Sequence, residues 1–344
     1  MIAKFKQYTI FDGFYNQMSN KILKIGVFTS GGDAPGMNAA IRAVVRACTY
    51  YNIDCYGIMR GYEGMIDGDI MKLDARSVGN ILQRGGTVLK SARSTEFRTP
   101  EGRKKAFDNL KQEGIDALVA IGGDGTFTGL HKFYQEYQFP SICIPGTIDN
   151  DLSGTDFTIG YDTATNTAVE AIDKIRDTAL SHNRLFFIEV MGRHSGYIAI
   201  NSGIAGGAGA IIIPEEEFSF DDLYKKLMSG EETNKKSNLV VVAEGSKIGN
   251  AQELAQKVAE RTNYFDIKVT VLGHLQRGGA PTYFDRVLAS RMGVAAVEGL
   301  INGKNDVMVG IQNNLMVYNS FDVIMSKHHE IDDESLRISK ILSI

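Results

Sequence analysis

The sequence is short of three features that would point to particular classes of protein: paired cysteines, a strong excess of one charge, and long apolar runs. Its three cysteines, Cys48, Cys55 and Cys143, show neither a paired framework nor metal-ligand spacing, so we expect buried free thiols and a reducing, cytoplasmic setting. The net charge of −4 gives no electrostatic reason to expect nucleic acid or an anionic membrane as a partner. No apolar run approaches the roughly 20 residues that a membrane-spanning helix needs.

Proline is also scarce, with 6 residues against 37 glycines, which fits many tight turns between strands and helices. The chain has 344 residues, 43% hydrophobic and 23% charged, an ordinary composition for a globular protein of one large or two average domains. No repeat or low-complexity linker marks a domain boundary. Residues 1–23 are interpreted as an N-terminal extension, aromatic-rich and without a signal-peptide pattern, and Met18 is an alternative start.

Apolar runs typical of buried strands alternate with segments of helical period along nearly the whole chain. The expected strands cover residues 25–28, 117–121, 141–144, 185–190, 210–213, 239–243 and 267–272. Helices are expected after Gly36 and after Asp162, each with an apolar stripe. Continuous Val, Ile and Leu runs separated by helices predict an α/β fold with mostly parallel sheets covered on both faces.

Most of the expected strands end in a polar or glycine-rich cluster. Such clusters occupy residues 29–36, 122–126, 147–151, 191–196, 244–246 and 273–279. Ligands of open α/β sheets bind at the carboxyl ends of the strands, so these clusters are expected to gather around one cleft. A single glycine-rich loop is usually only a turn.

Two of these clusters suit a magnesium–phosphate group. Residues 30–38 join a strand to a helix N-terminus, where glycines let phosphate oxygens approach backbone N–H groups, although a tight turn is an equal reading. In Gly122-Gly-Asp-Gly-Thr126, Asp124 can hold Mg²⁺, or it can simply cap the next helix. Residues 30–38 match neither the G-x-x-x-x-G-K-[ST] loop nor the dinucleotide-binding fingerprint.

The segment Thr147-Ile-Asp-Asn-Asp151 places two carboxylates and a hydroxyl directly after a strand. Asp149 and Asp151 repel each other unless a metal, an arginine or a proton is close by. The alternative is an Asx-turn. Arg193 and Arg277 suit phosphate oxygens, and His274 and Glu244 suit sugar hydroxyls, although each of these is individually more often structural. Together the clusters predict a phosphoryl-transfer enzyme.

Five motifs in order, between about Lys24 and Gln312, resemble those of bacterial-type ATP-dependent 6-phosphofructokinases. They occupy residues 25–42, 122–126, 145–151, 189–193 and 273–279. The resemblance implies transfer of the γ-phosphoryl group of MgATP to the 1-hydroxyl of fructose 6-phosphate, the committed step of glycolysis. It also implies two similar three-layer Rossmann-like domains, a cleft between them, and a homotetramer with active sites shared between subunits.

The resemblance carries over residue by residue. Asp149 matches the proton acceptor, and Thr147, Asp151 and Arg193 are the other expected catalytic residues. The expected ATP contacts are Gly32, Arg93, Ser94, Gly123, Asp124, Gly125 and Thr126, with Asp124 on Mg²⁺. The expected sugar-phosphate contacts are Thr147, Ile148, Asp149, Met191, Gly192, Arg193, Glu244, His274 and Arg277, joined by Arg184 and Lys268 from a neighbouring subunit. The ATP domain is expected to be 24–160 with 274–325, and the fructose 6-phosphate domain 161–273 with 326–344.

The chain departs from the family at several positions. Lys268 stands where well-known members have a second cross-subunit arginine, so the charge is kept and the bidentate fork is lost. The allosteric nucleotide pocket keeps Arg42, Arg46 and Arg176. Ala75, Thr233 and Gly209 replace an arginine, a lysine and a glutamate of that pocket. Regulation by ADP or phosphoenolpyruvate therefore does not follow from the resemblance.

Three rival functions remain. A pyrophosphate-dependent enzyme of the same fold usually has Asp at the position of Gly125 and Lys at that of Gly146, and both are glycine here. A non-catalytic, nucleotide-sensing paralogue could lose the acids, but Asp124 and Asp149 are present. A lipid or NAD kinase shares the Gly-Gly-Asp-Gly turn but should lack the clusters at 191–193 and 274–277.

Overall fold

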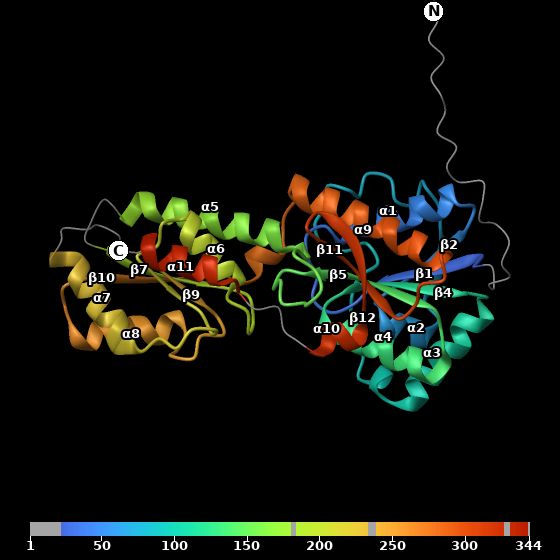
Figure 1. Ribbon diagram of the computed structural model, residues 1–344, viewed down its shortest axis with the longest axis horizontal. Helices are drawn as coiled ribbons and strands as arrows, with labels where there is room; N and C mark the ends of the chain where they lie inside the picture. The colour runs from blue at the N-terminus through green and yellow to red at the C-terminus, as the bar shows by residue number, and fades with distance from the viewer. Residues whose placement is uncertain (1–21, 180–183, 233–238, 327–330, 343–344) are drawn as a thin grey trace, which may run out of the picture.

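The computed structural model describes residues 22–179, 184–232, 239–326 and 331–342. Figure 1 shows two lobes side by side, each built on one β-sheet with helices on both faces. Residues 1–21 of the predicted N-terminal extension, and Thr233, lie outside the described residues. No helix in the described part of the chain combines the length and the apolar character needed to cross a bilayer.

The larger sheet has eight strands and lies in the first lobe. Its order is β12-β11-β5-β4-β1-β2-β3, with β6 paired to β5. The strands are β1 (Lys24–Thr29), β2 (Asp54–Ile58), β3 (Ile70–Leu73), β4 (Ala117–Gly122), β5 (Ser141–Thr147), β6 (Ile159–Gly160), β11 (Val307–Gln312) and β12 (Leu315–Ser320). The central strands run parallel, and β3 and β12 pair antiparallel at the two edges.

Helices cover both faces of this sheet, which explains why its central strands are continuously apolar. On one face lie α1 (Met37–Tyr50) and α9 (Tyr283–Ile301), and on the other α2 (Tyr62–Asp67), α3 (Pro100–Gln112), α4 (Asp124–Tyr137) and α10 (Phe321–Ser326) (Figure 1). A short 3₁₀ turn, η1 (Glu96–Arg98), precedes α3. Every residue of β4 is buried because it is packed from both sides.

The smaller sheet has four parallel strands in the order β10-β7-β9-β8. These are β7 (Arg184–Val190), β8 (Ala210–Ile212), β9 (Leu239–Ala243) and β10 (Asp266–Val271). One face is covered by α5 (Tyr161–Ala179), α6 (Tyr197–Ala205) and α11 (Asp333–Leu342), and the other by α7 (Phe220–Glu232) and α8 (Ala251–Arg261). The predicted α/β class with mostly parallel sheets is confirmed, although the two sheets differ in size.

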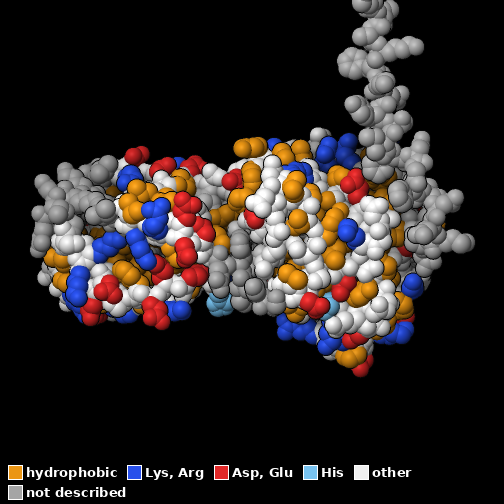
Figure 2. Space-filling model, in the orientation of Figure 1, with side chains coloured by type: hydrophobic (Ala, Val, Ile, Leu, Met, Phe, Trp, Pro, Cys, Tyr) orange, Lys and Arg blue, Asp and Glu red, His pale blue; other side chains and the backbone are white. Residues whose placement is uncertain are grey.

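The chain passes between the lobes where β6 leads directly into α5, and again where the 3₁₀ turn η2 (Gly273–Arg277) leads into α9. On the face drawn in Figure 2, acidic and basic side chains are interspersed on the lobe that carries the smaller sheet. The predicted domain boundaries at 160/161 and 273/274 fall beside these crossings, and the ligand assigned to each domain stays a prediction.

Candidate active site

Three of the predicted loops lie side by side because β1, β4 and β5 are parallel neighbours whose carboxyl ends meet at one edge. The backbone N–H of Ser30 donates to the carbonyl oxygen of Ile121 at 3.0 Å, which joins the first loop to the second. A Cβ on Gly122 would stand 2.6 Å from the carbonyl oxygen of Ser30. Gly122 therefore permits a backbone contact that any side chain would obstruct.

Two helices begin at this edge without a side-chain cap. The N-cap residues are Gly36 for α1, in the left-handed region at φ 104°, and Gly123 for α4, and neither helix start receives a side-chain hydrogen bond. The first N–H groups of a helix have no partner within the helix and attract anions. Nothing lies within 4 Å of a Cβ built on Gly125, so the space beside the first turn of α4 is open.

Asp124 fits a magnesium ion that is shared with phosphate. Its exposed side chain stands in the first turn of α4, between Gly123 and Gly125. Among the residues that the structure describes, no group of three or more His, Cys, Asp or Glu side chains could hold a metal by itself. Mg²⁺ commonly takes one or two carboxylates and completes its shell with water and phosphate oxygens, which is what a single carboxylate at a phosphate-attracting helix end allows.

Asp149 is a buried carboxylate after β5, with only 4% of its surface exposed. Burial is the main cause that raises its pKa to about 6, and the neighbouring charge of Asp151 raises it further. The guanidinium groups of Arg277 and Arg193 act in the opposite direction. Its Oδ1 atom is buried and makes no hydrogen bond within the described structure. Asp149 is thus a stronger base than an ordinary carboxylate, and its Oδ1 atom can accept a proton.

The loop that carries Asp149 is braced by its own polar groups. Asn150, at φ 50°, accepts the N–H of Thr158 at 2.8 Å through its side-chain oxygen. The Thr158 hydroxyl donates to the carbonyl oxygen of Thr147 at 2.7 Å. From the other lobe, the Ser195 hydroxyl donates to the carbonyl oxygen of Asp149 at 2.8 Å. Asp149 is therefore positioned from both lobes.

The second lobe presents the turn after β7. One oxygen of Glu244 accepts the backbone N–H groups of Gly192 and Arg193, at 3.2 and 2.7 Å. This carboxylate holds Arg193 in the left-handed region, at φ 53°. The side chain of the fully buried Gln276 accepts the N–H of Met191 at 2.9 Å, which joins this turn to η2.

Arg277 crosses from η2 to the first loop of the larger sheet. Its Nη1 atom donates to the carbonyl oxygen of Asp33 at 3.1 Å. A Cβ on Gly32 would stand 2.5 Å from the same Nη1, so glycine is needed for this approach. Gly32, Arg277, Arg193 and Asp149 are thereby brought to one junction between the lobes.

Other predicted site residues are less constrained. Arg93 and His274 are exposed, and the Ser94 hydroxyl accepts the N–H of Phe97 at 3.2 Å. Thr126 is buried, and its carbonyl oxygen accepts the Tyr62 hydroxyl. Ile148 is fully buried beside Asp149. The ligand contacts of these residues stay predictions.

Arg184 and Lys268 lie apart from the junction. Arg184 begins β7, whereas Met191 follows the end of that strand, and Lys268 lies on the neighbouring strand β10. Both cations bind Asp266, at 3.2 and 2.7 Å. Their proposed role at the site of a neighbouring subunit stays a prediction.

The three predicted effector residues are also divided between the lobes. Arg42 and Arg46 lie on α1, and Arg176 lies in the last turn of α5. One terminal nitrogen of Arg176 is buried without a hydrogen bond in the described structure. The role of these three residues in binding an effector stays a prediction.

Ser195 and Gln276 were not predicted as site residues, although both are buried and hydrogen-bond to segments of the site. Both stand inside motifs that were selected from the sequence, at 191–196 and 273–279. Position within a motif was thus a usable signal. A short polar residue flanked by ligand-contacting ones is a candidate anchor for its neighbours.

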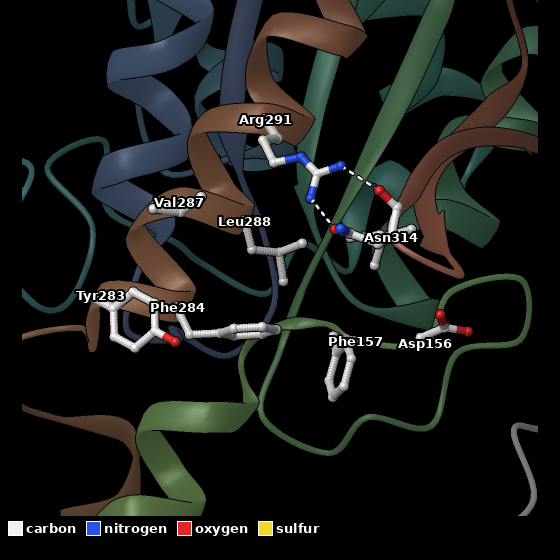
Figure 3. A pocket seen from close by; sticks show the side chains of 9 residues that line it. Asp156, Phe157, Tyr283, Phe284, Val287, Leu288, Arg291 and Asn314 are labelled. Atoms are coloured by element: carbon white, nitrogen blue, oxygen red, sulfur yellow. Dashed lines mark hydrogen bonds between the residues drawn. The ribbon is translucent and has the colours of Figure 1, made fainter.

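A separate pocket lies away from this junction. It has a volume of about 360 Å³ and lies between helix α9 and the loop that carries Asp156 and Phe157 (Figure 3). Phe157 and Phe284 meet there edge to face, with ring centroids 5.0 Å apart. Arg291 is held by the side chain and carbonyl oxygens of Asn314, at 2.8 and 2.6 Å. None of the predicted site residues lines this pocket.

The sequence matches the profile of a known protein family and resembles several named proteins. The profile of the family described as phosphofructokinase matches residues 24–300. A protein of Cytophaga hutchinsonii named ATP-dependent 6-phosphofructokinase is 56% identical over 320 residues, which are 93% of this chain and 98% of that one. One of Bacteroides thetaiotaomicron, named ATP-dependent 6-phosphofructokinase 2, is 52% identical over the same shares of both chains.

Solved structures show the same architecture. Phosphofructokinase from Saccharomyces cerevisiae superposes with a TM-score of 0.83 at 37% identity and covers 92% of this chain. This chain spans only 46% of the yeast chain. A pyrophosphate-dependent phosphofructokinase from Marinobacter aquaeolei has a TM-score of 0.81 at 21% identity over 93% of this chain, which shows likeness of fold alone.

Proposed function

The chain belongs to the phosphofructokinase family, and we propose that it is an ATP-dependent 6-phosphofructokinase that phosphorylates the 1-hydroxyl of fructose 6-phosphate. One observation carries the proposal beyond family membership. Asp149 is a buried carboxylate with a pKa raised to about 6, and the charges of Arg193 and Arg277 act on it at the junction where the glycine-rich loops end. This combination suits proton removal from a hydroxyl next to a polyphosphate.

The donor phosphates are bound at the first turns of α1 and α4. Both helix starts offer N–H groups without a side-chain cap, and glycines let oxygens approach the backbone. Asp124 would hold a Mg²⁺ ion, which neutralises charge on the phosphates when it is bound. Gly125 leaves the space that the rest of a nucleoside triphosphate requires.

Asp149 removes the proton of the sugar hydroxyl. Its raised pKa makes it a stronger base than an exposed carboxylate, and at neutral pH it is still ionised. Arg193 and Arg277 keep it ionised despite burial, and their charges also oppose the negative charge that spreads over the transferred phosphoryl group. Because transfer needs positioning and charge neutralisation more than covalent chemistry, these groups suffice for the protein's part.

ATP rather than pyrophosphate is the proposed donor because Gly125 and Gly146 lack the side chains typical of the pyrophosphate-dependent group. The named relatives at 52–56% identity support this choice. The likeness to pyrophosphate-dependent structures, at 21–23% identity, concerns the fold alone.

The assembly, the location and the regulation are further parts of the proposal. A homotetramer would let Arg184 and Lys268 complete a neighbour's site. A cytoplasmic location is supported by three free, buried cysteines. A weak response to ADP and phosphoenolpyruvate is proposed because Ala75 and Gly209 supply neither the cation nor the acid of the family pocket. Saturation curves for fructose 6-phosphate with millimolar effector measure that response.

A coupled assay tests the function. Purified protein is supplied with Mg²⁺ and fructose 6-phosphate, and with either ATP or pyrophosphate, and fructose 1,6-bisphosphate is measured. We expect product with ATP and at most trace product with pyrophosphate. Product with pyrophosphate alone would establish the rival donor. No product with either donor, from folded protein that still binds ATP, would favour a nucleotide-sensing role.

A further inference from the structure

The first turns of α5 and α9 face each other at the junction of the two lobes (Figure 1). The two helices belong to different lobes, and each begins where the chain has just crossed between them. Two helix N-termini at one point bring together several backbone N–H groups that lack partners within their helices. An acceptor is therefore required at this contact.

Asp285 supplies that acceptor from the first turn of α9. It is fully buried, and its Oδ1 atom accepts the N–H of Gly160 at 2.9 Å. Its Oδ2 atom accepts both the N–H and the hydroxyl of Thr163, at 2.9 and 2.5 Å. One carboxylate of the first lobe thus caps the first helix of the second lobe.

The bonding is reciprocal. The Thr163 hydroxyl also accepts the N–H of Thr282 at 3.0 Å. The Thr282 hydroxyl donates to the Asp162 carboxylate at 2.6 Å and caps its own helix by accepting the N–H of Asp285 at 3.3 Å. Each helix start therefore carries a side chain that bonds to the other.

The same contact abuts the nucleotide loop. A Cβ on Gly36 would stand 3.5 Å from the Cβ of Asp285, and a Cβ on Gly160 would stand 2.7 Å from the Cβ of Ala34. Both glycines have positive φ, at 104° and 103°. The first loop, the end of β6 and the starts of α5 and α9 thus meet around one side chain.

We propose that Asp285 is a positioning residue that fixes the angle between the two lobes, and thereby aligns the nucleotide loops of one lobe with the sugar-phosphate residues of the other. The proposal rests on the proposed function, because alignment matters only if donor and acceptor are held by different lobes. Asp285 itself touches neither substrate nor the reacting atoms.

The alignment role explains why a charged group is kept in this buried position. Burying a carboxylate is costly, and burial raises the pKa of Asp285 to about 6 while the bonds from Thr163 and Gly160 lower it. A hydrophobic contact would hold two helix ends together without the free-energy cost of a buried charge, but it would not fix their relative orientation. Three directed hydrogen bonds to one carboxylate, reinforced by two helix dipoles, define an orientation.

The test compares Asp285→Asn with wild type by kcat, the two KM values and thermal unfolding. Asparagine keeps the shape but turns an NH₂ group toward a backbone donor. We expect kcat per folded protein to fall roughly 10- to 100-fold, the usual effect of a misplaced catalytic geometry. Each KM is expected to change less than about threefold, because each substrate's binding groups remain in place.

Thr163→Val and Thr163→Ser form a matched pair if Asp285→Asn fails to fold. Valine removes the hydroxyl at nearly constant volume and serine keeps it, so the fall in kcat should appear in the first and be mostly rescued in the second. Asp306→Asn is the control, since that carboxylate bonds to His131 within the first lobe. It should shift the unfolding temperature without lowering kcat.

Two results would overturn the proposal. One is a lower unfolding temperature in Asp285→Asn or Thr163→Val with wild-type kcat per folded protein, which would make the contact merely structural. The other is an equal loss of kcat in Thr163→Ser and Thr163→Val. An inactive wild type would instead remove the proposed function, which the coupled assay tests separately.

Discussion

At the scale of single residues, Asp149 brings together the requirements of a general base. It is buried, its pKa is raised to about 6, and Oδ1 has no hydrogen bond within the described structure. A carboxyl group of ordinary pKa would be ionised but weakly basic at neutral pH, whereas a pKa near the working pH favours proton transfer. Burial therefore tunes this residue for its proposed step.

Asp149→Asn should lower kcat by roughly 10²–10⁴-fold, the usual contribution of a positioned base. The change is nearly isosteric, so circular dichroism should show an intact fold. Asp156→Asn is the matched control on the same loop, because Asp156 is exposed and its carboxylate accepts the N–H of Asn313 at 2.8 Å. Wild-type turnover in Asp149→Asn would remove the base from the mechanism.

The raised pKa of Asp149 also predicts two opposite effects of pH. The value of kcat/KM should fall as pH drops through about 6, because the base becomes protonated. The free energy of unfolding should change in the opposite direction and rise as pH drops. The folded-state pKa lies above the ordinary value of about 3.9, so protonation stabilises the fold and this contribution is lost as pH rises through about 6.

Asp149→Asn, which is neutral at every pH, should therefore unfold at higher urea than wild type at pH 7, and the difference should shrink at pH 5. Urea titrations at the two pH values measure this. A variant less stable than wild type at pH 7 would contradict the assigned cause of the shift.

The motif residues could be identified from sequence because glycine and acid clusters follow strand-like runs. Asp285 could not, because its three bonds reach Gly160 and Thr163, more than a hundred positions earlier. In the sequence it is only an acid near the start of a largely apolar helix. Contacts between segments far apart in the sequence can be identified only once the fold is known. Residues that join the lobes therefore cannot be predicted from sequence motifs.

At the scale of elements, the first turn of α4 should determine which phosphoryl donor is used. Gly125→Asp has free space for its side chain, so the fold should tolerate it. The new charge beside the polyphosphate should raise the KM for ATP at least about tenfold, since a repulsion near 1.4 kcal/mol suffices. Titration of ATP measures it.

Thr128→Asp is the control for Gly125→Asp. It adds the same charge to the exposed surface of α4, where the Thr128 hydroxyl now bonds to the carbonyl oxygen of Asp124. An equal rise in KM for both variants would show that Gly125 does not border the nucleotide and that net charge alone is responsible.

Helix α3 is anchored by a buried arginine. Arg103 is 2% exposed, forms two hydrogen bonds of 2.6 Å to Glu136 on α4, and also donates to the carbonyl oxygens of Phe97 and Arg98. Glu136→Ala leaves a buried cation without its partner and should lower the free energy of unfolding by about 3 kcal/mol.

Urea unfolding of Glu136→Ala should be compared with Asp108→Ala. That variant breaks the exposed pair between Lys104 and Asp108 on α3, which should contribute no more than about 0.5 kcal/mol. Similar losses in the two variants would mean that burial of Arg103 has no energetic weight.

Most of the predicted strands are buried, although β10 was predicted at a largely exposed sheet edge and β11 was missed although it is mostly buried. Strand β4 is fully buried and reads as one apolar run, whereas β3 and β12 lie at sheet edges with mixed exposure and were not predicted. β2 was also missed, because Asp54 and Gly57 interrupt its apolar pattern. An edge strand has one unpaired side and is partly exposed to solvent, so its sequence shows only a weak hydrophobic pattern.

At the scale of the whole molecule, the position of Arg184 predicts a site shared between copies. It lies at the opposite end of β7 from Met191, so it cannot serve its own chain's junction. Mixing Arg184→Ala chains with Asp149→Asn chains should recover activity, because a hybrid can form one intact composite site.

The control mixes Asp149→Asn with Asp124→Ala, whose defects both lie within one chain's own site, and should recover nothing. Exchange of subunits is verified by mass spectrometry. Hybrids of Arg184→Ala and Asp149→Asn that form but stay inactive would mean that each site is built from a single chain.

The surroundings of Gly125 and Gly146 also determine the order in which substitutions at these two positions could change the phosphoryl donor. A side chain at position 125 enters empty space, whereas a Cβ at position 146 stands 3.0 Å from Ile121 and 3.2 Å from Met37. The acid can therefore arise in one mutational step without repacking, but the lysine requires an earlier adjustment of the apolar neighbours. A lineage that changes its donor from ATP to pyrophosphate would therefore acquire the substitution at position 125 first. It would pass through an intermediate that uses ATP poorly before it is adapted to pyrophosphate.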